Sequence, residues 1–319
     1  MGNTQLRASA PGSYISPGMT ASSAASHDRT LAGIGLMLAG IFVFALNDAL
    51  GKWLVATYSV GQLLLVRSTA AAVLLIPFLW RDGGRAFRAA PRPWVQLLRP
   101  VFATFEVACF YWALTSLPLA DVMTFYLAGP IYVTAVSPLL LGEHVGWRRW
   151  FAVIAGFVGV MIALDPSGQT LTPAAMIALA GSFSFSLLMI CTRLVRGTSD
   201  LVLITTQTAG ALVFGLLVAP FTWVALNPRD TLLLVLLGVT AMVAHVCINR
   251  SLKLAPASVV VPYQYSTIFW AILLGYFIFG DIPRTEMLTG AGIIIAAGLY
   301  IFVREARRSR PVEMVDPPA

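Results

Sequence analysis

The stretch LAGIFVFALNDALGK, residues 38–52, recurs in altered form as LAGSFSFSLLMICTR, residues 179–193. Aligned without a gap, the two copies share a Leu-Ala-Gly start, two phenylalanines two residues apart and a basic residue at the end. Each copy belongs to an apolar run long enough to cross a bilayer. The copies differ where the first has Asn47-Asp48 and the second has Leu188-Met189. The helical scaffold is therefore duplicated and the polar pair is not, which indicates where to look for function.

The composition is that of an integral membrane protein. Of 319 residues, 58% are hydrophobic and only 11% are charged, whereas a soluble domain is about one quarter charged. The net charge of +7 resides in short loops between apolar runs, as membrane orientation requires. No basic arm or face is left to bind nucleic acid, so we expect no nucleic-acid partner, and the lipid bilayer is the expected surrounding.

Ten apolar segments, each long enough for a membrane-spanning helix, follow one another with short connections. They cover residues 31–50, 60–80, 96–115, 119–141, 149–164, 173–192, 201–223, 231–250, 257–279 and 287–303. No connection has room for a soluble catalytic domain, so the fold class is predicted to be all-α integral membrane. Residues 1–30 lack the features of a signal peptide and are expected to be a disordered cytoplasmic tail. Residues 304–319 are expected to be a second cytoplasmic tail.

The duplication extends beyond the first helix of each half. Pro77-Phe78 and Pro220-Phe221 close the second and seventh segments, and Gly142-Glu143 and Gly280-Asp281 close the fourth and ninth. Residues 31–164 and 173–303 are therefore interpreted as two copies of a five-helix unit. Because five is odd, the second copy enters the membrane from the opposite side, which predicts ten transmembrane helices in a 5+5 inverted repeat. Secondary transporters use this architecture, with the solute site at the repeat interface; a duplicated scaffold without transport is the alternative.

The loop cations predict the orientation. Seventeen of the 21 Lys and Arg residues fall on the side of the termini, and three (Lys52, Arg229 and Arg284) fall on the other. The remaining cation, Arg67, lies inside the second segment. By the positive-inside rule, both termini are expected to be cytoplasmic, in a multi-pass protein of a bacterial inner membrane.

Charges within membrane segments are costly and usually face a cavity. Asp48 lies near the outer end of the first segment, Arg67 about two turns into the second, and Asp121 opens the fourth. In one interpretation Asp48 and Arg67, with Asn47 beside them, form a polar end of a solute cavity, or one carboxylate carries protons. In the other, Asp48 and Arg67 form a structural ion pair or reach the interface. For Asp121, so close to a helix start, an N-cap role is favoured.

Glu106 lies near the middle of the third segment, too deep to reach either interface easily. Tyr111 and Trp112 follow it by one to two turns. A carboxylate with aromatic neighbours suits a flat or cationic organic solute. A protonated glutamic acid that forms a hydrogen bond inside the bundle is the alternative.

Prolines in corresponding segments of the two halves also point to a cavity. Pro130 interrupts the fourth segment, with Tyr126 one turn before it. The ninth segment has an unusually polar start, Pro262-Tyr263-Gln264. Tyr126, Tyr263 and Gln264 are therefore candidate solute ligands; ordinary kinks with interfacial tyrosines are the alternative.

Motifs of several other protein classes are missing from the sequence. It contains no glycine-rich phosphate loop with Lys-Ser or Lys-Thr, no HExxH and no GxSxG. Cys109, Cys191 and Cys247 have no metal-binding spacing and are predicted to be free thiols within the membrane. We therefore expect neither an enzyme nor ATP hydrolysis, and no cofactor or metal ion.

Ten segments in a 5+5 repeat, the opening LAGIFVFALNDALGKWL and Gly142-Glu143 after the fourth segment resemble the drug/metabolite transporter superfamily, and more closely its EamA-type members. This resemblance implies movement of a small organic solute by alternating access without ATP. Asn47-Asp48, Lys52-Trp53 and Val60-Gly61-Gln62 are most similar to bacterial riboflavin importers. That similarity implies riboflavin uptake across the inner membrane.

Under this resemblance an isoalloxazine ring would need aromatic walls and a few hydrogen-bonding groups, which Tyr111, Trp112, Tyr126, Tyr263 and Gln264 could supply. S-adenosylmethionine carriers and amino-acid exporters share the architecture and stay open as alternatives. A non-transporting membrane scaffold or an intramembrane enzyme is the alternative from another class. A homodimer is an open alternative to a monomer.

Overall fold

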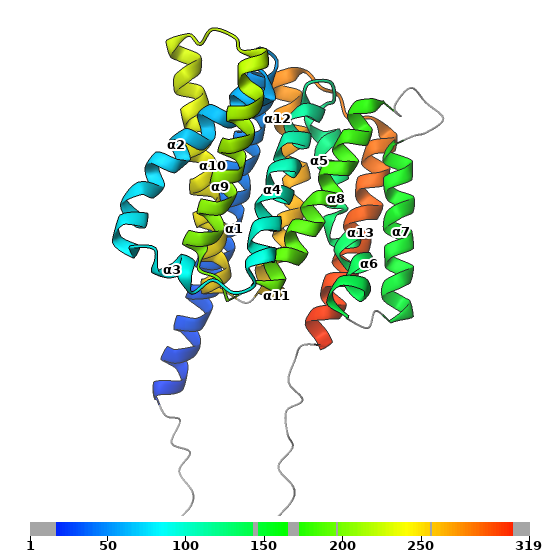
Figure 1. Ribbon diagram of the computed structural model, residues 1–319. Helices are drawn as coiled ribbons and strands as arrows, with labels where there is room; N and C mark the ends of the chain where they lie inside the picture. Colours follow the sequence, from blue (N-terminus) through cyan, green and yellow to red (C-terminus); the bar gives the residue numbers. More distant parts are fainter. Residues whose placement is uncertain (1–16, 143–145, 165–171, 196, 256, 309–319) are drawn as a thin grey trace, which may run out of the picture.

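The computed structural model describes residues 17–142, 146–164, 172–195, 197–255 and 257–308. Within these residues every regular element is a helix (Figure 1). The first half contains α1 (Pro17–Val55), α2 (Val60–Asp82), α3 (Arg85–Arg88), α4 (Pro93–Leu114), α5 (Leu119–Leu127), α6 (Gly129–Leu141) and α7 (Trp147–Leu164). The second half contains α8 (Pro173–Leu194), α9 (Asp200–Val218), η1 (Ala219–Thr222), α10 (Pro228–Leu254), α11 (Ala257–Val260), η2 (Val261–Ser266), α12 (Thr267–Leu274), η3 (Gly275–Phe279) and α13 (Thr285–Arg308).

The predicted all-α membrane architecture is confirmed. Among the described residues, nine helical stretches are long and apolar enough to cross a membrane, with α5 and α6 counted together. They match nine of the ten predicted segments. The remaining one, the ninth segment (residues 257–279), is divided into the short elements α11, η2, α12 and η3, so no single long helix represents it.

The ends of several helices differ from the predicted ones. α1 begins at Pro17, so helix extends into the region predicted to be a disordered tail; proline is favoured at the first position of a helix. α13 continues to Arg308, beyond the predicted end at residue 303. Residues 1–16 and 309–319, and Glu143 of the Gly-Glu motif, lie outside the described residues.

Helix packing follows the symmetry of the repeat. The first helix of each half packs against the third helix of the other half, giving the pairs α1 with α10 and α8 with α4. The second helices, α2 and α9, pack together, and so do the last helices, α7 and α13. Exchanging the two halves leaves this set of pairs unchanged, which is what an inverted repeat requires.

Small residues allow the last helices of the two halves to approach closely. A Cβ atom on Gly290 of α13 would lie 2.5 Å from the Gly159 carbonyl oxygen of α7. Glycine is common at such contacts in membranes, because helix association there depends on close packing rather than on hydrophobic burial. The α7–α13 contact therefore holds the two halves together on one side of the bundle.

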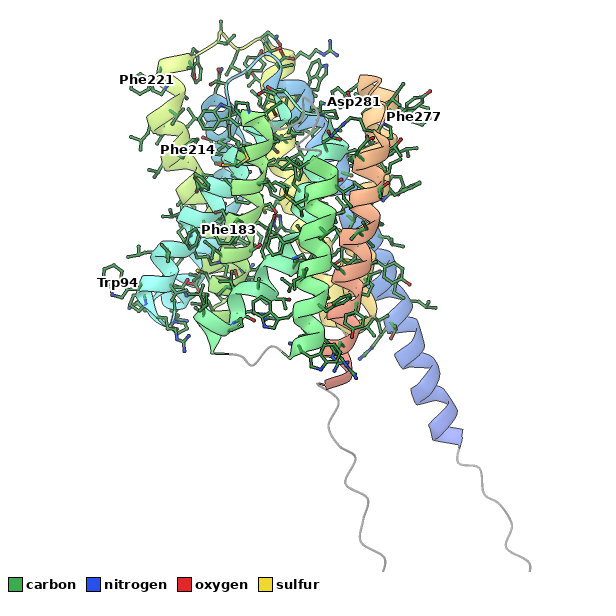
Figure 2. All side chains as sticks on the ribbon, turned by 90° about the vertical axis from the view of Figure 1, so that its right-hand side faces the viewer. Trp94, Phe183, Phe214, Phe221, Phe277 and Asp281 are labelled. Atoms are coloured by element: carbon green, nitrogen blue, oxygen red, sulfur yellow. The ribbon has the colours of Figure 1, made fainter. Side chains whose placement is uncertain are left out.

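The N-terminal end of α1 and the C-terminal end of α13 lie on the same side of the bundle (Figure 1). We call this the terminal side and the opposite one the far side. Exposed aromatic side chains occur toward both, with Trp94 toward the terminal side and Phe221 and Phe277 toward the far side (Figure 2). Aromatic residues at two levels are typical of the two interfaces of a membrane.

Candidate functional site

Two interrupted helices, one in each half, build the centre of the molecule. α5 ends at Leu127 and α6 begins at Gly129, followed by Pro130. In the second half, Pro262 lies in the 3₁₀ helix η2, which precedes α12. Proline has no backbone N–H, so a helix loses one of its hydrogen bonds there and is often kinked or broken. The predicted interruptions in corresponding segments are thus confirmed, and both line the same cavity.

This cavity has a volume of about 550 Å³, within the range of roughly 300–1,000 Å³ usual for small-molecule sites. Both halves line it. The lining residues are Ile41, Phe44, Asp48, Met123, Tyr126, Leu127, Gly129, Pro130, Val133, Thr134, Ser137, Arg149, Phe185, Met189, Arg193, Ile248, Gln264, Tyr265, Thr267, Gly298, Ile301 and Phe302.

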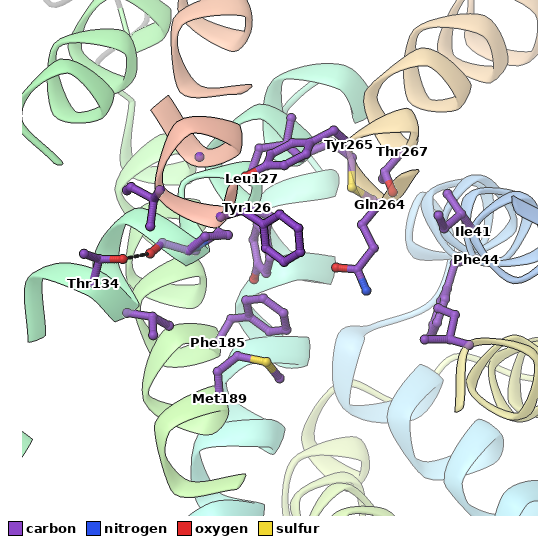
Figure 3. A pocket seen from close by; sticks show the side chains of 18 of the residues that line it. Ile41, Phe44, Tyr126, Leu127, Thr134, Phe185, Met189, Gln264, Tyr265 and Thr267 are labelled. Carbon is purple, nitrogen blue, oxygen red and sulfur yellow. Dashed lines mark hydrogen bonds between the residues drawn. The ribbon is translucent and has the colours of Figure 1, made fainter. Parts of the chain in front are cut away.

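Aromatic rings and one amide dominate the middle of the cavity (Figure 3). The Tyr126 hydroxyl donates a hydrogen bond of 3.0 Å to the backbone oxygen of Glu106, and its ring packs edge-on against Phe110. Tyr126 and Phe185 lie on one side of the space and Phe44 on the other, with Gln264 reaching between them (Figure 3). Within the described residues the Gln264 amide makes no hydrogen bond, so both its donor and its acceptor face the cavity.

Asp48 is the one acidic side chain among the cavity-lining residues, all of which the structure describes. Of the two interpretations of Asp48 and Arg67, the structural ion pair does not occur between these two described residues. Arg67 Nη1 instead donates a hydrogen bond of 2.8 Å to the hydroxyl of Tyr111, whose residue is only 1% exposed. The ring of Tyr111 fills the space beside Gly51, where a Cβ atom would overlap it. Arg67, Tyr111 and Glu106 therefore do not line the cavity, although Glu106 is connected to it through Tyr126.

Three further candidates do not line this cavity. Trp112 is 50% exposed and Tyr263 is 38% exposed, and neither lines the cavity. Asn47 is buried between α1 and α10, where its amide donates to the Leu237 carbonyl at 2.6 Å and to Thr240 Oγ1 at 2.8 Å. The reason is rotation, because each residue turns an α-helix by about 100°. Of the nine predicted site residues, Asp48, Tyr126 and Gln264 line the cavity.

The repeat alignment contained a signal for residues that were missed. It pairs Phe44 with Phe185 and Asp48 with Met189, and all four line the cavity. Positions related by an inverted repeat meet where its pseudo-two-fold axis crosses the bundle. Arg149 also lines the cavity. Nothing in the sequence distinguishes it from the other loop cations with which it was counted.

On the far side, two ion pairs join the halves. Lys52 Nζ lies 2.5 Å from Asp281 Oδ2, and Arg284 Nη2 lies 2.9 Å from Asp121 Oδ2. The N-cap role expected for Asp121 is wrong, because Pro118 occupies the N-cap of α5 and Asp121 lies inside that helix.

The cavity extends toward the terminal side. Its lining includes residues close to the terminal-side ends of α7, α8 and α13, such as Arg149, Arg193 and Phe302. Toward the far side it stops at Asp48 and Met123, below the two ion pairs. The cavity lining therefore reaches the terminal-side ends of these helices, whereas the two ion pairs lie beyond its far-side limit.

No group of three or more His, Cys, Asp or Glu residues in the described part of the chain could hold a metal ion. Cys109, Cys191 and Cys247 are free thiols within helices, as predicted.

Comparison with known proteins identifies relatives over nearly the whole chain. The model of the EamA-like transporter family matches residues 31–164 and 172–303. An S-adenosylmethionine uptake transporter of Rickettsia felis is 25% identical over 278 residues, 87% of this chain and 94% of the relative. A riboflavin transporter of Vibrio cholerae is 28% identical over 288 residues, 88% and 96% of the two chains. A pseudopaline exporter of Pseudomonas aeruginosa is 24% identical over 276 residues, 85% and 95% of the two chains. A crystal structure at 17% identity, covering 89% of this chain and 99% of the other, has a TM-score of 0.59 and shares the fold.

Proposed function

Because this chain belongs to the EamA-like transporter family, a family of multi-pass membrane carriers of small metabolites, we propose that it imports riboflavin across a bacterial inner membrane. It does so by alternating access, without ATP. The proposed solute is that of the riboflavin transporter to which the chain is similar, and the proposed direction is that of the S-adenosylmethionine uptake transporter.

The observation that carries the proposal is the environment of Gln264. Its amide has no hydrogen-bond partner in the described residues and lies among the rings of Tyr126, Phe185 and Phe44 (Figure 3). The isoalloxazine ring of riboflavin is flat and has an imide edge with one donor between two acceptors. A carboxamide offers a donor and an acceptor side by side, so it complements that edge while aromatic faces cover the ring.

The transport cycle follows from the position of the cavity. The cation distribution supports a cytoplasmic terminal side, so the cavity of this structure faces the cytoplasm. Outward opening requires separation of the two far-side ion pairs and closure of the terminal side, as the two halves rock about the solute.

S-adenosylmethionine is a second candidate, favoured by Asp48. A carboxylate in the cavity attracts a solute cation, and S-adenosylmethionine has both a sulfonium and an ammonium group. Its adenine ring would occupy the aromatic part of the cavity.

Uptake of labelled riboflavin and labelled S-adenosylmethionine into proteoliposomes tests both solutes. Gln264→Ala is expected to raise the KM for riboflavin about tenfold, the equivalent of one or two lost hydrogen bonds. Tyr263→Ala is the matched control, since the neighbouring tyrosine does not line the cavity and its loss should leave KM within twofold.

Riboflavin uptake that is indifferent to Gln264→Ala, or absent while S-adenosylmethionine is taken up, would exclude riboflavin as the solute of this site. Growth of a riboflavin auxotroph without its own importer provides a check in cells. Flux of neither solute would move the assignment to an amino-acid exporter or to a membrane protein without transport activity.

A further inference from the structure

Arg149 is the most unusual cavity-lining residue. It is the third residue of α7, is only 8% exposed and lines the cavity. Its guanidinium makes no hydrogen bond or ion pair with any residue that the structure describes. An arginine side chain carries five N–H donors in a planar fork, and no described residue accepts a hydrogen bond from any of them.

Its neighbour shows that this burial is specific. Arg148 is exposed and lies over the ring of Trp147, with its guanidinium carbon 5.2 Å from the ring centroid. Arg148 behaves as an interfacial arginine does, by extending away from the bundle toward water. Arg149 is the next residue of the same helix and lies at the same depth, but its side chain lines the cavity instead of being exposed. The exposed Arg148 is enough to supply a terminal-side cation for membrane orientation. Orientation therefore does not explain why Arg149 is buried in the cavity.

A second cation lies at the same end of the cavity. Arg193, near the terminal-side end of α8, also lines it. The single carboxylate of the lining, Asp48, lies deeper. Asp48 is four residues before Lys52 in α1, and Arg149 is fourteen residues before Ala163 in α7.

The far-side ends of these two helices are at similar depth, because Arg284 contacts both Asp121 and the Ala163 carbonyl while its neighbour Asp281 pairs with Lys52. At 1.5 Å per residue, Asp48 and Arg149 are then separated by roughly 15 Å along the bundle axis. The cavity is acidic at its deep end and basic at its terminal-side end.

We propose that Arg149, with Arg193 at the same end of the cavity, is an anion subsite that binds a carboxylate or phosphate group on a ring-bearing solute. The inference rests on the proposed function in that the cavity is taken to be the solute route. It extends the solute class from neutral ring compounds to ring compounds with an anionic end. Arginine is suited to this role because its fork pairs with two oxygens of either group.

Matched ligand pairs test the subsite in the purified full-length protein. Binding is measured by calorimetry for riboflavin and its 5′-phosphate, for adenosine and its 5′-phosphate, and for S-adenosylmethionine and its decarboxylated analogue. The first two pairs report on phosphate and the third on carboxylate. A charge-assisted contact to arginine should make the anionic member bind roughly 10- to 100-fold more tightly.

In Arg149→Gln the affinity ratio within each responsive pair should fall to about one, while the uncharged partner binds as before. Arg149→Lys should keep part of the preference, because it retains the charge and loses the fork. Arg148→Gln is the matched control and should leave every ratio unchanged. Equal binding within all three pairs in the wild-type protein overturns the proposal, and so does a preference that survives Arg149→Gln.

The outcomes also separate this inference from the proposed function. If riboflavin binds but no anionic member is preferred, the subsite is wrong and the proposed function stands. If riboflavin neither binds nor is transported, while adenosine 5′-phosphate is preferred over adenosine only when Arg149 is present, the subsite stands and the solute assignment is wrong.

Discussion

Removal of Arg284 should open the far side of the bundle. Arg284 Nη2 is 2.9 Å from Asp121 Oδ2, and the Asp121 side chain is only 7% exposed while that of Arg284 is 33% exposed. In Arg284→Gln the carboxylate stays in its buried position without its cation. Opening the far side would return it to water, so the substitution destabilises the closed state relative to the open one.

The magnitude follows from the geometry. At an effective dielectric constant of about 20, unit charges at this separation of 2.9 Å attract by roughly 6 kcal/mol. Desolvation offsets much of this attraction, and loss of one partner from a fully buried pair costs about 3–5 kcal/mol. Because Arg284 is partly exposed and the Lys52–Asp281 pair remains, we expect about 2 kcal/mol. That value corresponds to a shift of roughly 30-fold toward the far-side-open state.

Thiol labelling measures this shift. Met123 lines the far-side limit of the cavity, two residues beyond Asp121. Met123→Cys, in a protein whose three natural cysteines are replaced by alanine, is exposed to a membrane-impermeant thiol reagent on the far side. Arg284→Gln should increase its labelling rate by about an order of magnitude or more.

Asp121→Asn combined with Arg284→Gln should label more slowly than Arg284→Gln alone, because no buried charge is then left unpaired. Arg229→Gln is the control, since Arg229 is a far-side cation that lies over the Trp53 ring and belongs to neither of the two ion pairs described above. An unchanged labelling rate in Arg284→Gln, with normal amounts of protein in the membrane, would refute the role of this ion pair as a far-side gate.

Three further substitutions test the packing described above. Tyr111→Phe removes the acceptor of the Arg67 hydrogen bond and should lower the free energy of unfolding by about 1–3 kcal/mol, seen as a lower Tm in detergent; an unaltered Tm would contradict the contact. Trp112→Ala should leave the KM for solute within twofold, because this side chain is half exposed on the outside of the bundle, and a tenfold rise would put it back in the site. Gly290→Ala should destabilise by about 1–3 kcal/mol through overlap with α7, whereas Gly292→Ala, with nothing within 4 Å of the added carbon, should be neutral in the same thermal melt.

Much of the architecture could be predicted from the sequence because it depends on local properties. Hydropathy over a membrane-length window is a property of the segment itself, so nine spanning stretches and the divided ninth segment were located correctly. The odd number of segments per repeat requires that the second repeat be inverted. Pro130 and Pro262 indicated the interrupted helices, because the missing backbone N–H of proline is a local property. The exception is the helix from Pro17 onward, which begins before the apolar span that starts at Arg29, so hydropathy did not mark it.

The face that each helix turns to the cavity was decided by the tertiary structure. Tyr111 and Trp112 are adjacent in sequence, yet one is buried and the other half exposed, because one residue rotates the helix by about 100°. Asp48 and Arg67 are at compatible depths, but Arg67 reaches Tyr111 instead. Arg148 and Arg149 are the same residue type at the same helix end, and only the packing of α7 directs Arg149 into the cavity. The sequence by itself determined which segments enter the membrane and in which pairs they repeat. Which side chains meet across the repeats was determined only by the packed bundle, since contacts between distant segments depend on the rotation and depth of every helix at once.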